Sequence, residues 1–510
     1  MAGFQYYLLC FLLCLLSTLL LKYVFGKRNK SGTHLILPPI PPALPLIGHL
    51  HLLGPHFHIS LQSLSAKYGP LFRLHLGASR WIVVSSPAMA TEIFKIQDLA
   101  FADHAKLGSS AEETPYKKYG LFSTPYGDYF RFVRKVLMTE LLSPRQIERS
   151  RAVREEELIR FLHSLVECAE KKELVDVGAE LMKLTSNALS RLVVSARCSD
   201  KGDEAEGIRE LVKETFEVGS RMILGDVFGP LGKLVSLLYT KQNRNLHLNF
   251  DAFLERMLKD HEDQNRKIQH EDLTDMLLKL HKDDKADVEM TRSHLKALMV
   301  DLFIGGFGTT SETILWTIAE LINHPNAFNK LRQEIKSVVG SSRLVEESDV
   351  TGLPYLQAVV KEGLRLYPPL PVTTRSARQD CKIQGFDIPK ASMMSINLYA
   401  IMRDPESWLN PNEFWPERFL VSTKLEEEAV GENLNLLTFG AGRRACPGAK
   451  LALTILYRTV AAMVQCFDWK VGGDGEAKVN MESEKGSFLH MAHPLICLPV
   501  VHFNPFASSI

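Results

Sequence analysis

Cys446 is the side chain whose setting best suits chemistry. It lies in the run FGAGRRACPG at 439–448, whose glycines let the backbone pass close to a flat ligand because no Cβ intervenes. Pro447 fits the first position of a helix, so we expect a helix over 449–463 with Cys446 at its N-terminal end. There the helix dipole and unpaired N–H groups favour a thiolate and tune its electron donation to a metal.

A dinucleotide-binding turn is a second interpretation of the same run. Gly440, Gly442 and Ala445 match the pattern G-x-G-x-x-A, between a strand-like stretch at 434–439 and the expected helix. The chain that remains is too short for the other strands of such a fold. Asp468 also falls later than the spacing of about 20 residues expected for a ribose-binding acid. We therefore favour the thiolate.

Two further motifs contain residues that can support such a loop. Glu362 and Arg365 are three residues apart in a helix that starts at Pro354, so they share one face. Arg418 follows in an irregular segment, and the two arginines can lock that segment to Glu362. The alternative is a surface pair, worth under about 1 kcal/mol.

A third motif interrupts the long helix expected over 291–323. The run GGFGTTS at 305–311 places three glycines in the middle of that helix, and each costs roughly 1 kcal/mol relative to alanine. This cost indicates a kink, close approach of a ligand, or tight helix packing. Thr309 and Thr310 supply adjacent hydroxyls that can hold water and relay protons.

The elements that must position these residues form one large, mainly α-helical unit with small β-sheets. Helical periodicity dominates 143–331, residues 71–84 predict a hairpin, and 381–389 and 393–396 predict short strands. We expect a loop at 201–206 and solvated polar faces over the highly charged stretch 261–287. The histidines at 49, 51, 56 and 58 straddle a Gly-Pro pair without an acidic partner, and we do not expect them to bind a metal.

The N-terminus predicts a membrane anchor. Residues 4–25 are almost all apolar, and about 20 such residues span a bilayer. A cleaved signal peptide is the alternative, but no Lys or Arg precedes the apolar run and Lys27, Arg28 and Lys30 follow it. Positive charge stays cytosolic, so we expect a single-pass protein with its body in the cytosol. Residues 26–48 form a basic, proline-rich hinge, and 49–510 form the catalytic domain.

Composition excludes several classes of protein. Hydrophobic residues make up 45% of the 510, which excludes a disordered chain. Lys plus Arg number 60 and Asp plus Glu 59, so no basic excess indicates a nucleic-acid partner. The eight cysteines are scattered without a CxxC pair. They fit a reducing compartment, with all but Cys446 as buried filler.

These motifs, in this order, resemble the cytochrome P-450 family. The positions that match its haem-binding signature are Phe439, Gly442, Arg444, Cys446 and Gly448. Those that match its structural triad are Glu362, Arg365 and Arg418, and those that match its oxygen-binding helix are Gly306 and Thr309. The anchor, hinge and double arginine resemble the plant microsomal branch, and within it the group that holds flavone and isoflavone synthases and triterpene oxidases.

The resemblance implies haem b with Cys446 as axial thiolate, which promotes O–O cleavage. It also implies an endoplasmic reticulum membrane location, O2 as oxidant, and electrons from NADPH through a flavoprotein reductase. Haem propionates would be held by Arg134, Arg375 and Arg444. An apolar pocket would accept a lipophilic substrate. By family analogy its lining includes Phe303, Phe307, Leu370, Val372 and residues 486–495.

Two positions depart from the family pattern. Gly308 stands where the family usually has an acid before the threonine, so proton delivery would depend on Thr309, Thr310 and water. Phe130 stands where the family usually has tryptophan, which removes an indole N–H donor. We expect a terpenoid or triterpenoid monooxygenase. A flavonoid oxidase, a non-oxygenating isomerase or dehydratase, and a haem or small-molecule binder without turnover are the alternatives.

Overall fold

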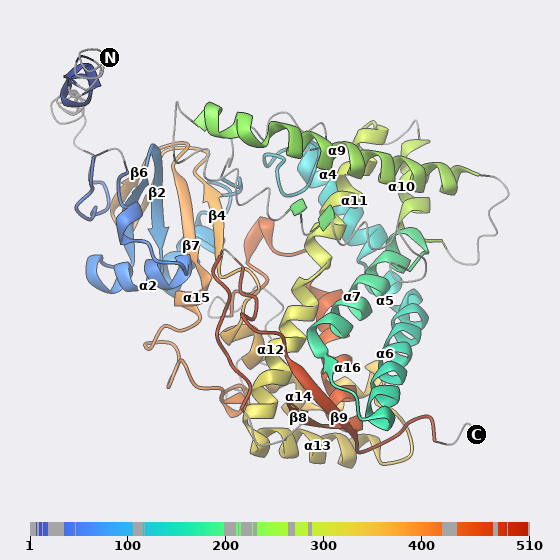
Figure 1. Ribbon diagram of the computed structural model, residues 1–510. Helices are drawn as coiled ribbons and strands as arrows, with labels where there is room; N and C mark the ends of the chain where they lie inside the picture. The colour runs from blue at the N-terminus through green and yellow to red at the C-terminus, as the bar shows by residue number, and fades with distance from the viewer. Residues whose placement is uncertain are drawn as a thin grey trace.

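A computed structural model shows helices gathered on one side and a small sheet with α2 on the other (Figure 1). The structure describes residues 7, 10–12, 14–18, 35–45, 47–105, 116, 118–197, 211–212, 214–215, 227, 232–263, 271–283, 288–420, 436–472, 478–486 and 488–507, with the backbone alone for 232–240 and 243. The predicted loop at 201–206 and most of the predicted anchor and hinge over 4–34 lie outside these residues.

Helices are the main secondary structure of the described residues, as the periodicity predicts. The α-helices are α2 (Phe57–Tyr68), α3 (Pro87–Thr91), α4 (Asp128–Val136), α5 (Pro144–Arg149), α6 (Arg151–Lys171), α7 (Val177–Val194), α9 (Gly232–Glu262), α10 (Leu273–His281), α11 (Arg292–Gly306), α12 (Thr309–Asn323), α13 (Pro325–Val339), α14 (Pro354–Leu366), α15 (Leu398–Ile401) and α16 (Ala449–Cys466). Short 3-10 or π turns are η1 (Leu50–Leu52), η2 (Glu92–Ile96), η4 (Leu137–Leu141), η6 (Glu347–Gly352), η7 (Pro416–Phe419) and η8 (Gly442–Arg444).

The strands form three small sheets. They are β1 (Leu71–Leu76), β2 (Ser79–Val84), β3 (Val175–Asp176), β4 (Val372–Ser376), β5 (Cys381–Ile383), β6 (Phe386–Ile388), β7 (Met393–Asn397), β8 (Phe467–Val471) and β9 (Ile496–Val501). The largest sheet has the order β1-β2-β7-β4, and only its β2–β7 pair is parallel. The hairpin predicted at 71–84 is confirmed by β1 and β2, and the short strands at 381–389 and 393–396 by β5, β6 and β7.

The helix expected over 291–323 is broken into α11 and α12, and both halves run through the middle of the molecule (Figure 1). Phe307 is extended and Gly308 has a φ of +88°, a conformation that residues with a Cβ rarely adopt. The kink that the glycines indicate is therefore present. Pro325 ends α12, because proline cannot follow a helical residue without a clash.

Three helices form the centre of the core. α12, α14 and α16 pack against one another, and α12 also contacts α7. Ile318, Val359 and Val460 are fully buried where these helices meet, and each such side chain contributes roughly 1.5–3 kcal/mol. This core fixes the start of α12 relative to the start of α16.

A buried ion pair fastens an irregular segment to α14. Glu362 and Arg365 are both fully buried, and Arg365 Nε donates to Glu362 Oε2 at 2.8 Å. Arg418 Nε lies 3.1 Å from Glu362 Oε1, which also accepts from the main-chain N–H of Trp415 at 2.9 Å. Arg365 Nη1 donates to the carbonyl of Met402 at 2.9 Å. The residues of the predicted triad thus hold residues 402–418 against the helix.

The proline-rich segment lies along the sheet. The carbonyls of Pro38 and Pro39 accept from the side chain and main chain of Arg73 in β1. His49, one of the four clustered histidines, places Nε2 2.8 Å from the carbonyl of Pro41 and accepts from the main-chain N–H of His75. Among the described residues, no helix has the length and apolar character that crossing a membrane requires.

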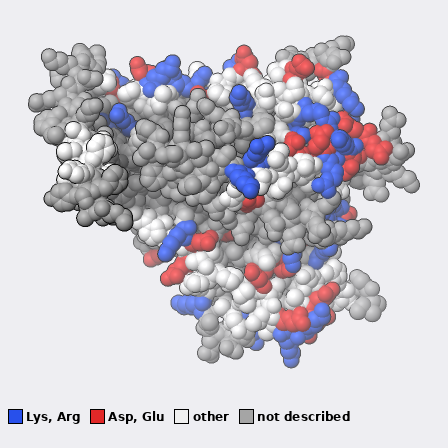
Figure 2. Space-filling view, turned by 45° about the horizontal axis from the view of Figure 1, so that its top comes forward, with Lys and Arg blue, Asp and Glu red and all other residues white. Residues whose placement is uncertain are grey.

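Charged side chains of both signs lie next to one another on the face shown in Figure 2. Ion pairs also link α9 and α11, where basic side chains of α11 bond to acidic side chains of α9. Arg292 bonds to Glu255 at 2.9 Å and to Glu262 at 2.7 Å, and Lys296 bonds to Asp251 at 2.7 Å. These pairs tie α9 to the first half of the broken helix.

Replacing Arg365 with Gln should lower the free energy of unfolding by about 3–5 kcal/mol, because the buried Glu362 carboxylate loses its main partner. Urea unfolding followed by circular dichroism measures the change. Arg343→Gln is the matched control, because its ion pair with Asp349 lies at the surface and should contribute little. Equal effects of the two variants would contradict the structural role of the buried pair.

Candidate active site

The cysteine loop is closed by its own main chain. The N–H of Cys446 donates to the carbonyl of Phe439 at 2.8 Å, and that of Ala445 donates to Gly442 at 3.0 Å. Gly442 has a φ of +69°, and a Cβ there would lie 2.6 Å from the carbonyl oxygen of Phe94. Only glycine fits this position, so the loop is held against η2.

The sulfur of Cys446 lies where the sequence predicts, just before a helix. α16 begins at Ala449, as expected, with Gly448 as its N-cap, so Pro447 lies two residues before the helix and not at its first position. The N–H groups of Gly448 and Ala449 donate to the sulfur, and Arg134 adds a positive charge nearby. These three groups favour the thiolate.

Desolvation is the opposing effect, and it raises the pKa of the Cys446 thiol. Cys446 is nevertheless an exposed residue. Cys446 therefore stays open to contact, and an apolar group could cover it.

The dinucleotide interpretation fails on structure. The described residues 436–439 form no strand, and α16 leads into β8, which pairs with β9 antiparallel. A dinucleotide turn needs a parallel strand before the loop and another after the helix.

Three arginines from different elements lie near the loop. Arg134 of α4 donates to the carbonyl of Ala445 at 2.9 Å. Arg444 of η8 lies 3.8 Å above the ring of Phe130, the position at which the family pattern has tryptophan. Its guanidinium donates to three main-chain carbonyls, those of Ala102, Leu121 and Thr124.

Arg375 of β4 has the least compensated charge of the three. It is 3% exposed, and no carboxylate of the described residues lies within ion-pair distance. Burial, with a smaller contribution from the charge of Arg444, lowers the pKa of Arg375 to about 9. Its hydrogen bonds to described residues all start at Nη1. Nε and Nη2 are therefore available to an anion, which would relieve the unfavourable charge.

Thr309 and Thr310 begin α12 directly after the break. Thr309 Oγ1 donates to the carbonyl of Gly305 at 3.1 Å, across the break, whereas Thr310 is buried. Gly306 faces α7, since a Cβ there would lie 2.4 Å from Leu189. Of the two glycines Gly305 is the more open, with Phe122 at 3.4 Å from such a Cβ.

The predicted substrate lining is only partly accessible. Phe303 and Phe307 are 0% and 3% exposed and pack edge to face with centroids 5.3 Å apart. Both belong to one buried apolar cluster, in which Phe303 meets Phe253 of α9, so their assignment to the lining is wrong. Leu370 is 40% exposed.

A carboxylate that sequence reasoning missed holds the segment beside this site. The N–H groups of Leu121 and Phe122 donate to Asp301 of α11. The sequence signal was present, because Asp301 is the one charged residue in the apolar run ALMVDLFI at 297–304. Its role depends on contacts with a loop 180 residues away in the sequence, which no local pattern reveals.

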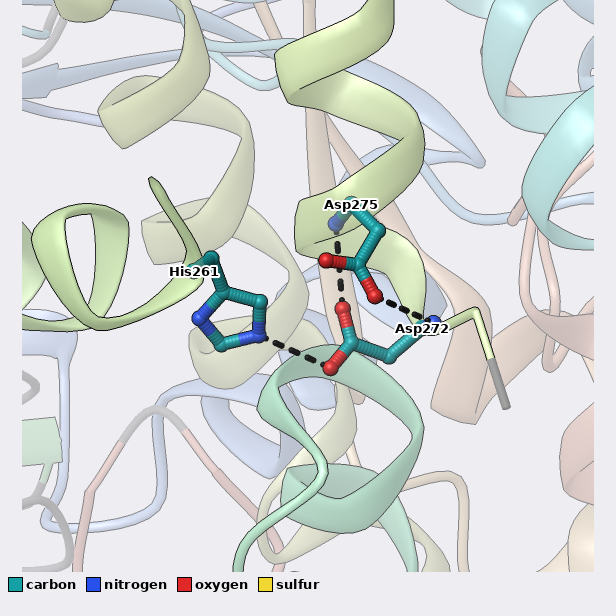
Figure 3. Close-up of side chains that lie close together, drawn as sticks. All are labelled: His261, Asp272 and Asp275. Carbon is teal, nitrogen blue, oxygen red and sulfur yellow. Dashed lines mark hydrogen bonds and ion pairs between the residues drawn. The ribbon is translucent and has the colours of Figure 1, made fainter. Parts of the chain in front are cut away.

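A group of side chains that could bind a metal lies at the C-terminal end of α9. His261, Asp272 and Asp275 place ligand atoms close together (Figure 3). Asp272 and Asp275 form a capping box at the start of α10, and His261 Nε2 lies 2.8 Å from Asp272 Oδ2. These bonds account for the cluster as a helix cap that ties α9 to α10. Both aspartates are buried, so the expectation of solvated faces over 261–287 is wrong here.

Comparison with known proteins agrees with this geometry. The model of the family "Cytochrome P450" matches residues 38–498. A mainly helical fold with small sheets and a candidate thiolate just before α16 match the class of haem-thiolate proteins. The chain belongs to the cytochrome P450 family. It is a haem-thiolate monooxygenase, and this family binds haem by cysteine ligation of the iron, works with a redox partner and takes lipophilic substrates.

Three plant relatives show the range of similarity. Cytochrome P450 705A5 of Arabidopsis thaliana is 43% identical over 96% of both chains. Beta-amyrin 24-hydroxylase of Glycine max is 39% identical over 98% of this chain and 99% of its own. The 3,9-dihydroxypterocarpan 6A-monooxygenase of Glycine max is 36% identical over 98% and 99%.

The Asp301 carboxyl should make stability depend on pH. Burial raises its pKa to about 7, from an ordinary value near 4. The folded protein therefore binds a proton that the unfolded chain has lost, so this stabilisation is complete below pH 4 and is lost as the pH rises through 7. We expect the thermal midpoint of the wild type, relative to Asp301→Asn, to fall between pH 5 and 8. A difference that is constant over that range would contradict the assignment.

Proposed function

We propose that this chain is a membrane-anchored monooxygenase that hydroxylates, or successively oxidises, a lipophilic plant terpenoid, with a triterpenoid as the first candidate. Electrons come from NADPH through a flavoprotein reductase, and O2 is the oxidant. The single observation that carries the proposal is the Cys446 sulfur, which accepts two main-chain N–H groups at the start of α16 and belongs to an exposed residue.

In this proposal Cys446 is the axial ligand of haem b. Phe439, Gly442 and Gly448 shape its loop. Arg134, Arg375 and Arg444 hold the two propionates, and the available Nε and Nη2 of Arg375 support this role. When bound, the haem activates dioxygen with the electrons that the reductase delivers.

The hydroxyl groups at the break between α11 and α12 relay protons. Thr309 presents its hydroxyl at the turn beside Gly306 and Gly308, and the adjacent hydroxyl of Thr310 helps to hold water and relay protons. The triad Glu362, Arg365 and Arg418 fastens residues 402–418 to α14. These roles follow from the contacts given above together with the matching positions in the family.

Membrane attachment is also part of the proposal. Residues 4–25 form a single-pass anchor in the endoplasmic reticulum membrane, 26–48 form the hinge, and 49–510 form the cytosolic catalytic domain. The apolar sequence of the first stretch supports this, with basic residues after it. Tyr7 and Phe11 are 77% and 63% exposed, and a bilayer would cover such side chains.

The choice of a terpenoid is supported by the 39% identity to a beta-amyrin hydroxylase and by the segment 488–498, which contains no Lys, Asp or Glu. A flavonoid oxidase is the second candidate, supported by the 36% identity to a pterocarpan monooxygenase.

A paired substrate screen tests the proposal. Microsomes that contain the chain and a plant reductase should convert a pentacyclic triterpene to an oxygenated product that requires NADPH, and a flavonoid panel should give at least tenfold less product, a preference of about 1.4 kcal/mol. Microsomes with Cys446→Ser are the control. Turnover of flavonoids alone would favour the second candidate. Turnover of neither class by a protein with an intact haem spectrum would contradict both.

A further inference from the structure

We propose that Glu312 and His490 form a proton-delivery pair that serves Thr309 and replaces the acid missing at Gly308. The inference rests on the proposed place of Thr309 at the oxygen-binding turn. It concerns two side chains that the family pattern does not account for, one from α12 and one from the C-terminal segment.

Glu312 lies one helical turn after Thr309. Residues three apart share a face of a helix, so the carboxyl and the hydroxyl project to the same side of α12. The Glu312 side chain is 15% exposed, and Oε1 lies 3.0 Å from Nδ1 of His490. Its Oε2 is buried and has no hydrogen-bond partner among the described residues. A buried carboxylate oxygen left unpaired is costly and is uncommon without a water or a functional reason.

The main chain holds His490 in place. Leu489 is bound on both sides, because its N–H donates to the carbonyl of Pro369 at 3.1 Å and its carbonyl accepts from Trp316 Nε1 at 3.0 Å. The carbonyl of His490 accepts from the N–H of Glu484 at 2.8 Å. The ring is therefore fixed against α12, while its side chain is 44% exposed to solvent.

The charges around the ring favour its protonated form. Desolvation lowers the pKa of His490, but the hydrogen bond to Glu312 and the negative charges of Glu312 and Glu484 outweigh it and raise the pKa above the ordinary value. An imidazolium next to a buried carboxyl can exchange a proton with it, and the exposed edge of the ring can exchange with water.

Thr309 and Glu312 belong to the same first turn of α12. The carbonyl of Gly308 accepts from the N–H of Glu312 and from Ser311 Oγ, each at 2.9 Å, so the first turn of α12 is closed despite the kink. Thr309 Oγ1 donates to Gly305, which leaves its oxygen lone pairs able to accept a proton.

The transfer is balanced in protons and involves no electrons. The Nδ1 proton of the His490 imidazolium passes to the Glu312 carboxylate. The carboxyl so formed gives a proton to the Thr309 hydroxyl, directly or through one water, as that hydroxyl releases its own proton to the oxygen-binding turn. This restores the Glu312 carboxylate, and the neutral ring, which keeps its Nε2 proton, takes a proton from water at Nδ1. Each cycle delivers one proton to the oxygen-binding turn.

The first test measures the pair in the resting ferric enzyme, without turnover. In protein labelled with 13C-histidine, the NMR titration of His490, assigned by its loss in His490→Gln, should shift to lower pH in Glu312→Gln. The shift should exceed one unit, a tenfold change in proton affinity. Trp316→Phe is the control, because it removes a hydrogen bond to the same segment but no charge. A titration that Glu312→Gln leaves unchanged would overturn the pair.

The second test measures coupling with the substrate that the screen identifies. Glu312→Gln and His490→Gln should each reduce product per NADPH by roughly tenfold, with the electrons diverted to peroxide, since general acid catalysis is worth about 10²–10⁴. The double variant should be no worse than either single variant, and Glu312→Asp should restore part of the loss. Unchanged coupling in variants with a normal thiolate spectrum would overturn the relay and leave a structural ion pair. A wild-type protein without that spectrum would overturn the proposed function, and the relay with it.

Discussion

The hydrogen bonds that two main-chain N–H groups donate to the Cys446 sulfur are the interaction on which the rest of this structure depends. Burial opposes ionisation of the Cys446 thiol, and two main-chain N–H groups and the charge of Arg134 oppose that effect. The N–H groups point at the sulfur only because the loop turns sharply before α16. That turn requires a glycine at 442, where a Cβ would overlap the carbonyl of Phe94.

The helical core connects the cysteine loop to Thr309. α16 carries the loop, α12 carries Thr309, and both pack against α14. The buried pair of Glu362 and Arg365 holds α14 to the segment that precedes the loop. A rigid three-helix contact can therefore keep the sulfur and the hydroxyl in a fixed relation, although they belong to elements far apart in the sequence.

Sequence reasoning succeeded where chemistry depends on neighbours along the chain. The cysteine loop, the helix after it and the kink at Gly308 each follow from local patterns of glycine, proline and apolar residues. It failed for Phe303 and Phe307, because helical spacing does not reveal which face meets α9. It also missed Asp301 and the pairing of Glu312 with His490. Their partners lie 180 and 178 positions away, and only the folded chain brings them together.

The most direct test of the central claim is the carbon monoxide difference spectrum of the reduced, purified protein. The wild type, and Cys381→Ser as a matched cysteine control, should show the long-wavelength Soret band of a carbonyl haem with a thiolate opposite. Cys446→Ser should lose that band. A serine variant that kept both the band and the turnover of the wild type would contradict the assignment of this sulfur to the iron.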